Sequence, residues 1–287
     1  MSNLIAISRK IKDMQSILKI SEALQLISST KLKSYKQIMV QGSDYQSGVN
    51  FLFEKFYTSY EHDYRITNSK FVFSPKKQKY PFWIVIGSDL SLCGRFNRQI
   101  VDFMVSKFPS NGFILVFGKK LFNLLSSTRL KNFIIANYPS EMNQADISKK
   151  ISEITKWVLK EYVTRNCYTL QLIFKGSDRP FNNLRLLPFT SDYFGKKNIK
   201  YETHEYRVRS TESVIELFPI YLEATLLNSL LDSKIAEHNL RREIMNNAVK
   251  AAEEKLNEYK ILYQKIRQAT ITQEISQITA ALKCKTN

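Results

Sequence analysis

Residues 231–266 read LDSKIAEHNLRREIMNNAVKAAEEKLNEYKILYQKI, and this stretch decides the fold. Its seam positions are separated by alternate steps of four and three residues over about five heptads, which is typical of a helix packed along a partner helix. They are Leu231, Ile235, His238, Arg242, Met245, Val249, Ala252, Leu256, Tyr259, Tyr263 and Ile266. Such a long seam cannot fold back on itself, so the sequence predicts a second long helix.

The N-terminal residues carry the matching pattern. After a possible N-cap at Ser2 or Asn3, the same alternation places apolar seam side chains at Leu4, Ile7, Ile11, Met14 and Leu18. Further apolar positions widen the stripe, at Ile17, Ile20, Leu24 and Ile27. The pattern predicts a helix to about Tyr57, with a weak point around Gly42 and Gly48.

Both ends of the chain lack helix-breaking residues, since Gly and Pro are absent from 1–41 and 220–287. The C-terminal helix is expected to begin near Thr211 or Ser213, with Pro219 in its first turns, and to reach about Ala281. A helix of 60 or more residues would be roughly 90 Å long. We expect helices over 1–60 and 211–285 that form an antiparallel coiled coil.

In the middle of the chain, apolar residues no longer recur at helical spacing and stand instead in short continuous runs. Short apolar runs, PFWIVIGSD, GFILVFGKK, KNFIIANYP and CYTLQLIFKG, each read as a buried strand. Helical stretches such as ADISKKISEITKWVLKEYVTRN lie between them. This alternation predicts a Rossmann-like α/β domain with a mainly parallel sheet over 80–205, inserted at the base of the coiled coil. Residues 69–79 read as a linker.

Composition limits the classes of protein. The 287 residues are 44% hydrophobic and 12% aromatic, enough for a packed core, and their net charge of +17 indicates an acidic partner. The charge is spread along the chain, whereas a nucleic-acid module usually concentrates it in one patch. Three cysteines without CxxC spacing fit a reduced, cytoplasmic protein. No apolar run is long enough to span a membrane, so no membrane insertion is expected.

Nucleotide-binding loops are not indicated. The segment from Gly112 to Gly118 has one residue too many for GxxxxGK, and Lys120 stands where a hydroxyl residue is needed. GSDLSLCG at 87–94 lacks the GxGxxG pattern and reads as a tight strand-to-helix turn.

Catalytic and metal sites are not indicated either. His62, His204 and His238 have no second ligand at metal-site spacing, and His238 reads as a packed or partner-facing side chain. Glu202 and Glu205 flank His204 without a nucleophile motif, and Ser88 and Cys93 have no base near them in the sequence. The sequence predicts no catalytic residue, no metal and no cofactor.

Three segments resemble the gamma subunit of the rotary F-type ATP synthase. KIRQATITQEISQITAAL at 265–282 is similar to the family's "KARQASITQELTEIV", and IKDMQSILKISEALQLISSTKLK resembles its N-terminal helix. SDLSLCGRFN is similar to "SDRGLCGGLN", with Ser91 and Arg95 in place of glycine, which predicts an altered turn.

The resemblance implies a mechanical function without an active site of its own. The coiled coil would turn inside a hexamer of alpha and beta catalytic subunits, above an epsilon-like foot subunit and a membrane rotor ring, at the inner face of the cell membrane. The collar contacts implied are Lys10, Lys12, Lys19, Lys31, Lys33, Arg267, Gln268 and Gln273. An exposed lysine can equally be no more than a solvated surface residue.

Two alternatives stay open from the sequence. The first is a gamma-like shaft of a divergent ATPase that hydrolyses ATP for transport or motility. The second is a coiled-coil adaptor or nucleic-acid-binding protein, which salt-dependent binding to duplex DNA would favour.

Overall fold

The computed structural model describes residues 2–60, 69, 71–72, 80–143, 145–177, 181–189 and 211–285. Two compact units share the chain. We call residues 31–240 the α/β unit, and residues 1–30 with 241–287 the two-helix unit. Two long helices, α1 (Ser2–Tyr60) and α6 (Thr211–Lys285), contribute to both units.

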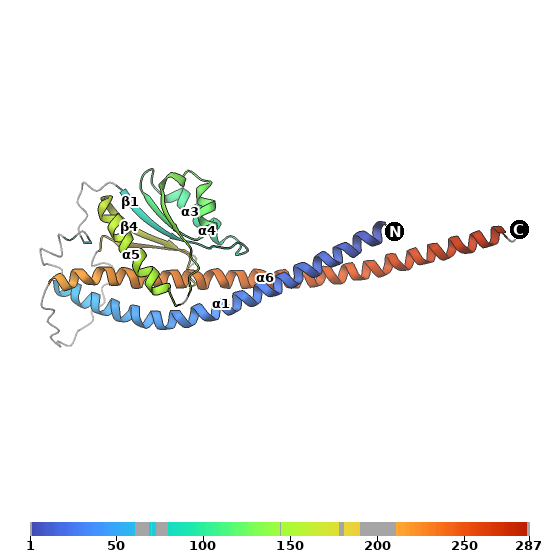
Figure 1. Cartoon of the computed structure of the whole chain (residues 1–287), viewed down its shortest axis with the longest axis horizontal. Coiled ribbons are helices and arrows are strands. Elements are labelled where there is room, and N and C mark those ends of the chain that lie inside the picture. Colours follow the sequence, from blue (N-terminus) through green and yellow to red (C-terminus); the bar gives the residue numbers. More distant parts are fainter. Residues whose placement is uncertain are drawn as a thin grey trace. The chain divides into compact units, whose positions relative to one another are not determined.

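The α/β unit contains a five-stranded sheet in the order β3-β2-β1-β4-β5. β1 pairs in parallel with β2 and β4, β2 pairs in parallel with β3, and β5 runs antiparallel to β4 (Figure 1). The strands are β1 (Tyr80–Ile86), β2 (Phe113–Phe117), β3 (Ile134–Tyr138), β4 (Cys167–Phe174) and β5 (Asn182–Leu187). The helices between them are α3 (Phe96–Lys107), α4 (Lys119–Ser126), the 3-10 turn η1 (Lys131–Phe133) and α5 (Ile147–Thr164).

The two faces of the sheet are covered by different helices. In β1, Phe82, Ile84 and Ile86 join the core cluster that also holds α5 and parts of α1 and α6, whereas Trp83 and Val85 join the cluster with α3 and α4. Side chains that alternate along a strand point to opposite faces, which explains the near-continuous apolar runs in the sequence.

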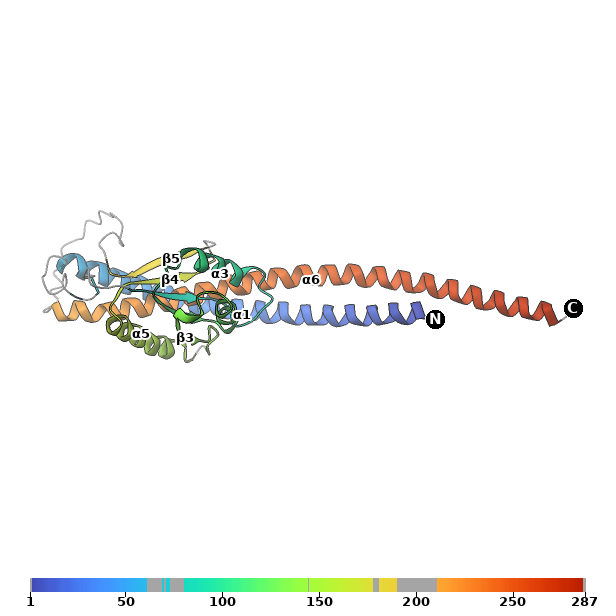
Figure 2. The ribbon, with the colours of Figure 1, turned by 90° about the horizontal axis from the view of Figure 1, so that it is seen from above.

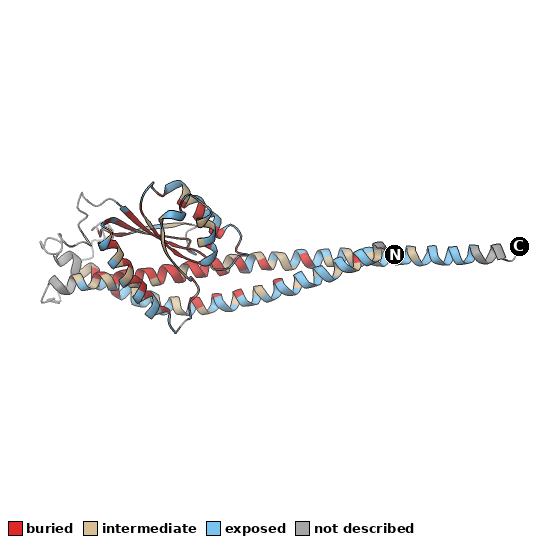
Figure 3. Cartoon of the chain, turned by 45° about the horizontal axis from the view of Figure 1, so that its top comes forward, coloured by how far each residue is buried: buried red, intermediate tan, exposed pale blue. Residues whose placement is uncertain are grey.

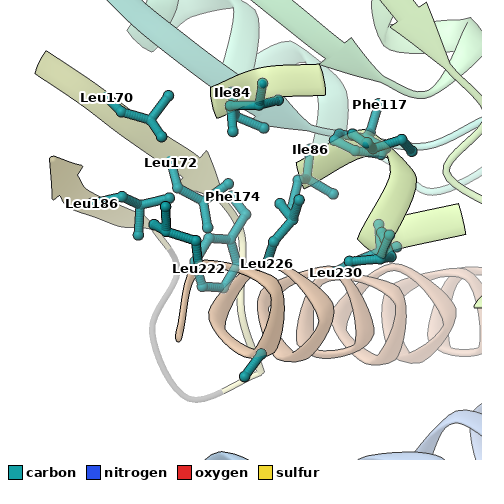
Figure 4. Packing of buried hydrophobic residues seen from close by; sticks show 14 of the residues in the cluster. Ile84, Ile86, Phe117, Leu170, Leu172, Phe174, Leu186, Leu222, Leu226 and Leu230 are labelled. Atoms are coloured by element: carbon teal, nitrogen blue, oxygen red, sulfur yellow. The ribbon is translucent and has the colours of Figure 1, made fainter. Parts of the chain in front are cut away.

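Within the α/β unit, α6 lies against the sheet. Leu222, Leu226 and Leu230 point from α6 toward the core side chains of β1 and β4, among them Ile84 and Phe174 (Figure 4). α1 runs beside α6 in this unit (Figures 1 and 2). Because this part of α6 packs against both the sheet and α1, residues 221–240 are all buried or half-buried (Figure 3).

Phe53 of α1 packs into an aromatic cluster in this unit. Its fully buried ring lies 4.6 Å from the ring of Phe189 and 4.9 Å from each of the rings of Phe218 and Tyr221, measured between centroids. Four aromatic side chains from α1, α6 and the end of β5 thus share one cluster.

The two-helix unit is an antiparallel pair. The Nε2 atom of Gln25 donates to Oδ1 of Asn246 at 3.4 Å, and the ammonium of Lys10 lies 5.6 Å above the ring of Tyr259. The lower number in α1 meets the higher number in α6, so the helices run in opposite directions. The predicted fold class, two long terminal helices with an inserted α/β domain, is confirmed.

Two expectations about the helices differ from the structure. α1 continues without a break through Gly42 and Gly48, because a helix packed along its length tolerates single glycines. Ile17, Ile20 and Ile27, expected to widen the packed stripe, are 44%, 59% and 54% exposed. A two-helix pair buries only a narrow seam, and these positions lie outside it.

Candidate functional site

Asp89 organises the loops at the carboxyl ends of the parallel strands. Its carboxylate accepts hydrogen bonds from the backbone N–H of Lys119 at 2.8 Å, the backbone N–H of Glu141 at 2.7 Å and the Ser140 hydroxyl at 3.1 Å. Lys119 is the first residue of α4, where the helix N-terminus attracts negative charge. The chain's own carboxylate therefore occupies a helix N-terminus, a kind of position that can also bind an anionic ligand.

The turn after β1 is held by its own polar side chains. Oδ1 of Asn97 accepts from the backbone N–H of Ser88 at 3.0 Å, and Nδ2 of Asn97 donates to the Ser88 hydroxyl at 2.6 Å. The Cys93 sulfur lies 3.6 Å from that hydroxyl and is 3% exposed. These contacts bind Ser88 and Cys93 into the turn itself and pair neither with a carboxylate or imidazole.

The two substitutions in this turn do not require glycine's conformational freedom. Positive φ angles occur at Leu92 (63°) and Gly94 (58°), whereas Arg95 has φ −85°. Arg95 therefore adopts an ordinary backbone conformation, and Ser91 is not among the described non-glycine residues with positive φ.

Lys175 lies at the carboxyl end of β4, next to the point where the strand order reverses. Its ammonium donates to the side-chain oxygen of Gln99 and lies 5.4 Å from the ring centroid of Phe96. Burial lowers the pKa of Lys175 below its ordinary value, although the nearby Cys93 opposes this shift. Lys175 thus lies where open α/β sheets often bind ligands, but its ammonium contacts Gln99 and Phe96 of the same chain.

The lysines proposed for collar contact fall into two groups. Lys12, Lys19 and Lys33 are exposed on α1, and so is Lys10, which lies over Tyr259. Lys31 has a partner inside the chain, because its ammonium lies 2.9 Å from the carboxylate of Glu141.

Glu141 links the loop after β3 to α1. Burial acts to raise the pKa of Glu141, but the hydrogen bond and charge of Lys31 outweigh burial and hold the pKa below its ordinary value. The backbone N–H of Glu141 is also held by Asp89. The sequence did not indicate this contact, since its members lie far apart in the chain.

The polar residues expected at the tip of α6 are Arg267, Gln268 and Gln273, and all three are exposed. Residues 271–280 are exposed on every side, including Ile271, Ile275 and Ile278.

The seam positions are the less exposed ones along both helices. Leu4, Ile7, Ile11, Met14 and Leu18 are buried or half-buried in α1, and so are Met245, Val249, Leu256 and Ile266 in α6. From residue 249 to residue 270 of α6, only Val249, Ala252, Leu256, Tyr259, Tyr263, Ile266 and Thr270 are not exposed. Arg242 was wrongly placed in the seam: it is exposed, and its neighbour Arg241 is 3% exposed.

Buried polar groups gather on α6 near this point. Lys234 and Glu237 form an ion pair at 2.8 Å with side chains 2% and 3% exposed. The ring of His238 stacks on that of Tyr35, and burial, with the charges of Glu141 and Glu237, raises the pKa of Tyr35. In the sequence, this buried polar cluster was indicated only by polar residues at or beside seam positions.

His62, His204, Glu202 and Glu205 lie outside the described residues.

No helix in the described part of the chain is long and apolar enough to cross a membrane. Over the same part, no three His, Cys, Asp or Glu side chains are grouped as metal ligands would be.

Comparison with known proteins identifies the family. The sequence profile of the ATP synthase family matches residues 3–284. The ATP synthase gamma chain of Malacoplasma penetrans is 28% identical over 298 residues, covering 99% of both chains. That of Clostridium botulinum (strain Hall) is 25% identical over 291 residues, also covering 99% of both.

Solved structures share the fold. The central stalk of the Tetrahymena thermophila mitochondrial ATP synthase matches with a TM-score of 0.58 and 20% identity over 80% of this chain and 99% of that chain. A chain of the Euglena gracilis mitochondrial ATP synthase matches with a TM-score of 0.57 and 13% identity over 92% and 95%. The chain belongs to the ATP synthase family, and the relatives that match it over nearly their whole length are named ATP synthase gamma chains.

Proposed function

We propose that this chain is the central rotary shaft of an F-type ATP synthase or ATPase and couples rotation to ATP synthesis or hydrolysis at sites on partner subunits. The observation that carries the proposal is the pair of antiparallel helices, with an apolar seam between them, in a chain that matches the family from residue 3 to 284. The chain itself is non-catalytic in this proposal, and ATP is made or hydrolysed by its partners.

The partners follow from the same proposal. A hexamer of alpha and beta subunits surrounds the helices, an epsilon-like subunit binds the foot, and a membrane rotor ring lies below. The protein is then peripheral at the inner face of the cell membrane. The matched Euglena structure is described as containing F1 and the c-ring, which supports this set of partners.

The collar contacts we propose are Lys10, Lys12, Lys19 and Lys33 on α1 with Arg267, Gln268 and Gln273 on α6. Their exposed side chains can reach acidic or polar groups of a surrounding subunit. We leave Lys31 out of this set, because its ammonium is paired with Glu141 inside the chain.

Reconstitution tests the proposal. The purified chain is mixed with the alpha and beta subunits of the same organism, the complex is isolated by size, and its ATP hydrolysis is measured with and without the chain. We expect one copy of the chain per hexamer and faster hydrolysis. Failure to associate, with hydrolysis by the hexamer unchanged, would contradict the proposal.

A matched pair of variants tests the proposed contacts at the tip. Replacing Arg267, Gln268 and Gln273 together by alanine should lower the stimulation of hydrolysis. The control replaces Glu253, Glu254 and Gln264, which are also exposed on α6. Equal losses in the two triple variants would show that the tip residues have no special role.

A further inference from the structure

The apolar seam alone does not determine how far along α6 each residue of α1 lies. Seam positions recur every seven residues, so a shift of α1 by one heptad, about 10.5 Å along the axis, again brings seam positions together. A contact whose shape or polarity is not repeated every seven residues can form in only one alignment of the two helices, so it can select that alignment. The α/β unit contains several such contacts between α1 and α6, among them the Phe53 ring cluster and two contacts made by polar side chains, which are described next.

The first contact joins Gly42 of α1 to Asn228 of α6. Nδ2 of Asn228 donates to the carbonyl oxygen of Gly42 at 3.2 Å, and Asn228 is 7% exposed. A Cβ atom on residue 42 would lie 2.9 Å from Oδ1 of Asn228, so the Asn228 amide would have to turn and give up its hydrogen bond to Gly42. After a one-heptad shift, Asn228 would meet Tyr35 or Val49, whose buried side chains are too large for that space.

The second contact is the stack of Tyr35 on His238. The ring centroids are 5.6 Å apart with an interplanar angle of 24°, and each residue is 3% exposed. A shift by one heptad would bring His238 opposite Ser28 or Gly42, neither of which has a ring to stack on.

The same helices are also tied separately to the loops of the α/β unit. Lys31 of α1 pairs with Glu141 after β3, and Asp232 of α6 accepts at 2.9 Å and 2.6 Å from the backbone N–H and hydroxyl of Ser177 after β4. These ties place each helix along its axis relative to the same sheet, and they agree with the alignment that the two contacts require.

Polar residues in a helix seam lower stability relative to apolar ones, and a single buried asparagine is the best-attested device for fixing coiled-coil register. We propose that the Gly42–Asn228 contact and the Tyr35–His238 stack form a register lock, which holds α1 and α6 in one axial alignment. The lock is a property of the chain by itself and does not depend on the proposed function.

Two glycines of α1 give a first test with a matched control. Nothing lies within 4 Å of a Cβ at Gly48, so Gly48→Ala should raise Tm by about 2 °C through its helix propensity. Gly42→Ala should instead lower Tm, and adding Asn228→Ala should restore it. Equal increases for Gly42→Ala and Gly48→Ala would overturn the lock at this contact.

Cysteine cross-linking of the full chain gives the second test and reads the alignment directly. Gln25 of α1 and Asn246 of α6 are joined by a hydrogen bond, so cysteines at these two positions report the native register. Gln25 with Asn239, and Gln25 with Glu253, report shifts by one heptad in the two directions. The background carries Cys284→Ser.

Both proteins compared also carry Lys31→Ala and Asp232→Ala, which remove the ties to the loops. The tested variant adds Asn228→Leu and His238→Leu, which leave an apolar seam. The unmodified seam should cross-link only in the native pair. The variant should keep its helical circular dichroism and yield at least one shifted pair. Cross-linking of the folded variant in the native pair alone would overturn the lock; if the variant does not fold, the comparison of Gly42→Ala with Gly48→Ala still decides.

Discussion

Replacing Asp89 by alanine removes three hydrogen bonds that connect three loops at one edge of the sheet. Two are donated by the backbone N–H groups of Lys119 and Glu141, and one by the hydroxyl of Ser140, which is 1% exposed. Hydrogen bonds to a charged group contribute about 1.5–3 kcal/mol each, but water replaces the bond at exposed Lys119 and partly replaces the bond at half-buried Glu141. We therefore expect a loss of about 2–4 kcal/mol in the free energy of unfolding.

Tryptophan fluorescence is the suitable assay, because both tryptophans, Trp83 and Trp157, lie in the α/β unit. The expected loss corresponds to a decrease in Tm of roughly 5–12 °C. Asp89→Asn keeps one acceptor oxygen but removes the charge, so its Tm should fall between those of the unmodified chain and Asp89→Ala.

Asp102→Ala is the control for removing a carboxylate. Asp102 is 56% exposed and lies 3.5 Å from Arg98 in a pair that is itself mostly exposed, so its loss should change the free energy of unfolding by less than about 0.5 kcal/mol. If Asp89→Ala and Asp102→Ala lowered Tm equally, the account of Asp89 as the residue that fixes these loops would be refuted.

Three further outcomes are expected in urea unfolding. Phe53→Ala should lose about 3–5 kcal/mol, because its ring is fully buried, whereas Phe51→Ala, at a position 51% exposed, should change little; similar losses would contradict the packing described. Burial raises the pKa of Cys167 to about 12, so its contribution to stability is complete below about pH 9 and is lost as the pH rises toward 12; Cys167→Val should flatten this decline, and an unchanged slope would contradict it. The pKa of Glu141 is lowered, so its contribution is present above about pH 4.5 and is lost on further acidification; Glu141→Gln should weaken the acid dependence, and an unaltered profile between pH 3 and 6 would argue against the Lys31 pair.

Periodicity was enough to predict the helices and the parallel strands. Seam positions such as Met245 and Leu256 are partly or fully buried where the four-three alternation places them, and FILVF and YPFWIVI form neighbouring strands. These features depend on residues close together in the chain, where one repeat fixes one face.

The polar contacts could not be predicted in the same way. Asp89 meets Ser140 and Glu141 across 51 and 52 residues, and Lys31 meets Glu141 from another element, so no local pattern connects them. The burial of Arg241 in place of Arg242 has a related cause. Just before Arg241, α6 is packed on more than one side. The seam pattern describes contact with one helix only, so it does not determine which of the two neighbouring arginines is buried.

The contact between Gly42 and Asn228 also has a consequence for biosynthesis. The two residues are 186 positions apart, and at about 5–20 residues per second a ribosome needs roughly 10–40 s to make the chain between them. During that interval, Leu32, Tyr35 and Phe53 have been made but the α6 side chains that cover them have not. The newly made N-terminal segment therefore lacks the α6 side chains that cover its apolar residues until roughly four-fifths of the chain has been synthesised, and we expect the last quarter of the chain to be decisive for its solubility.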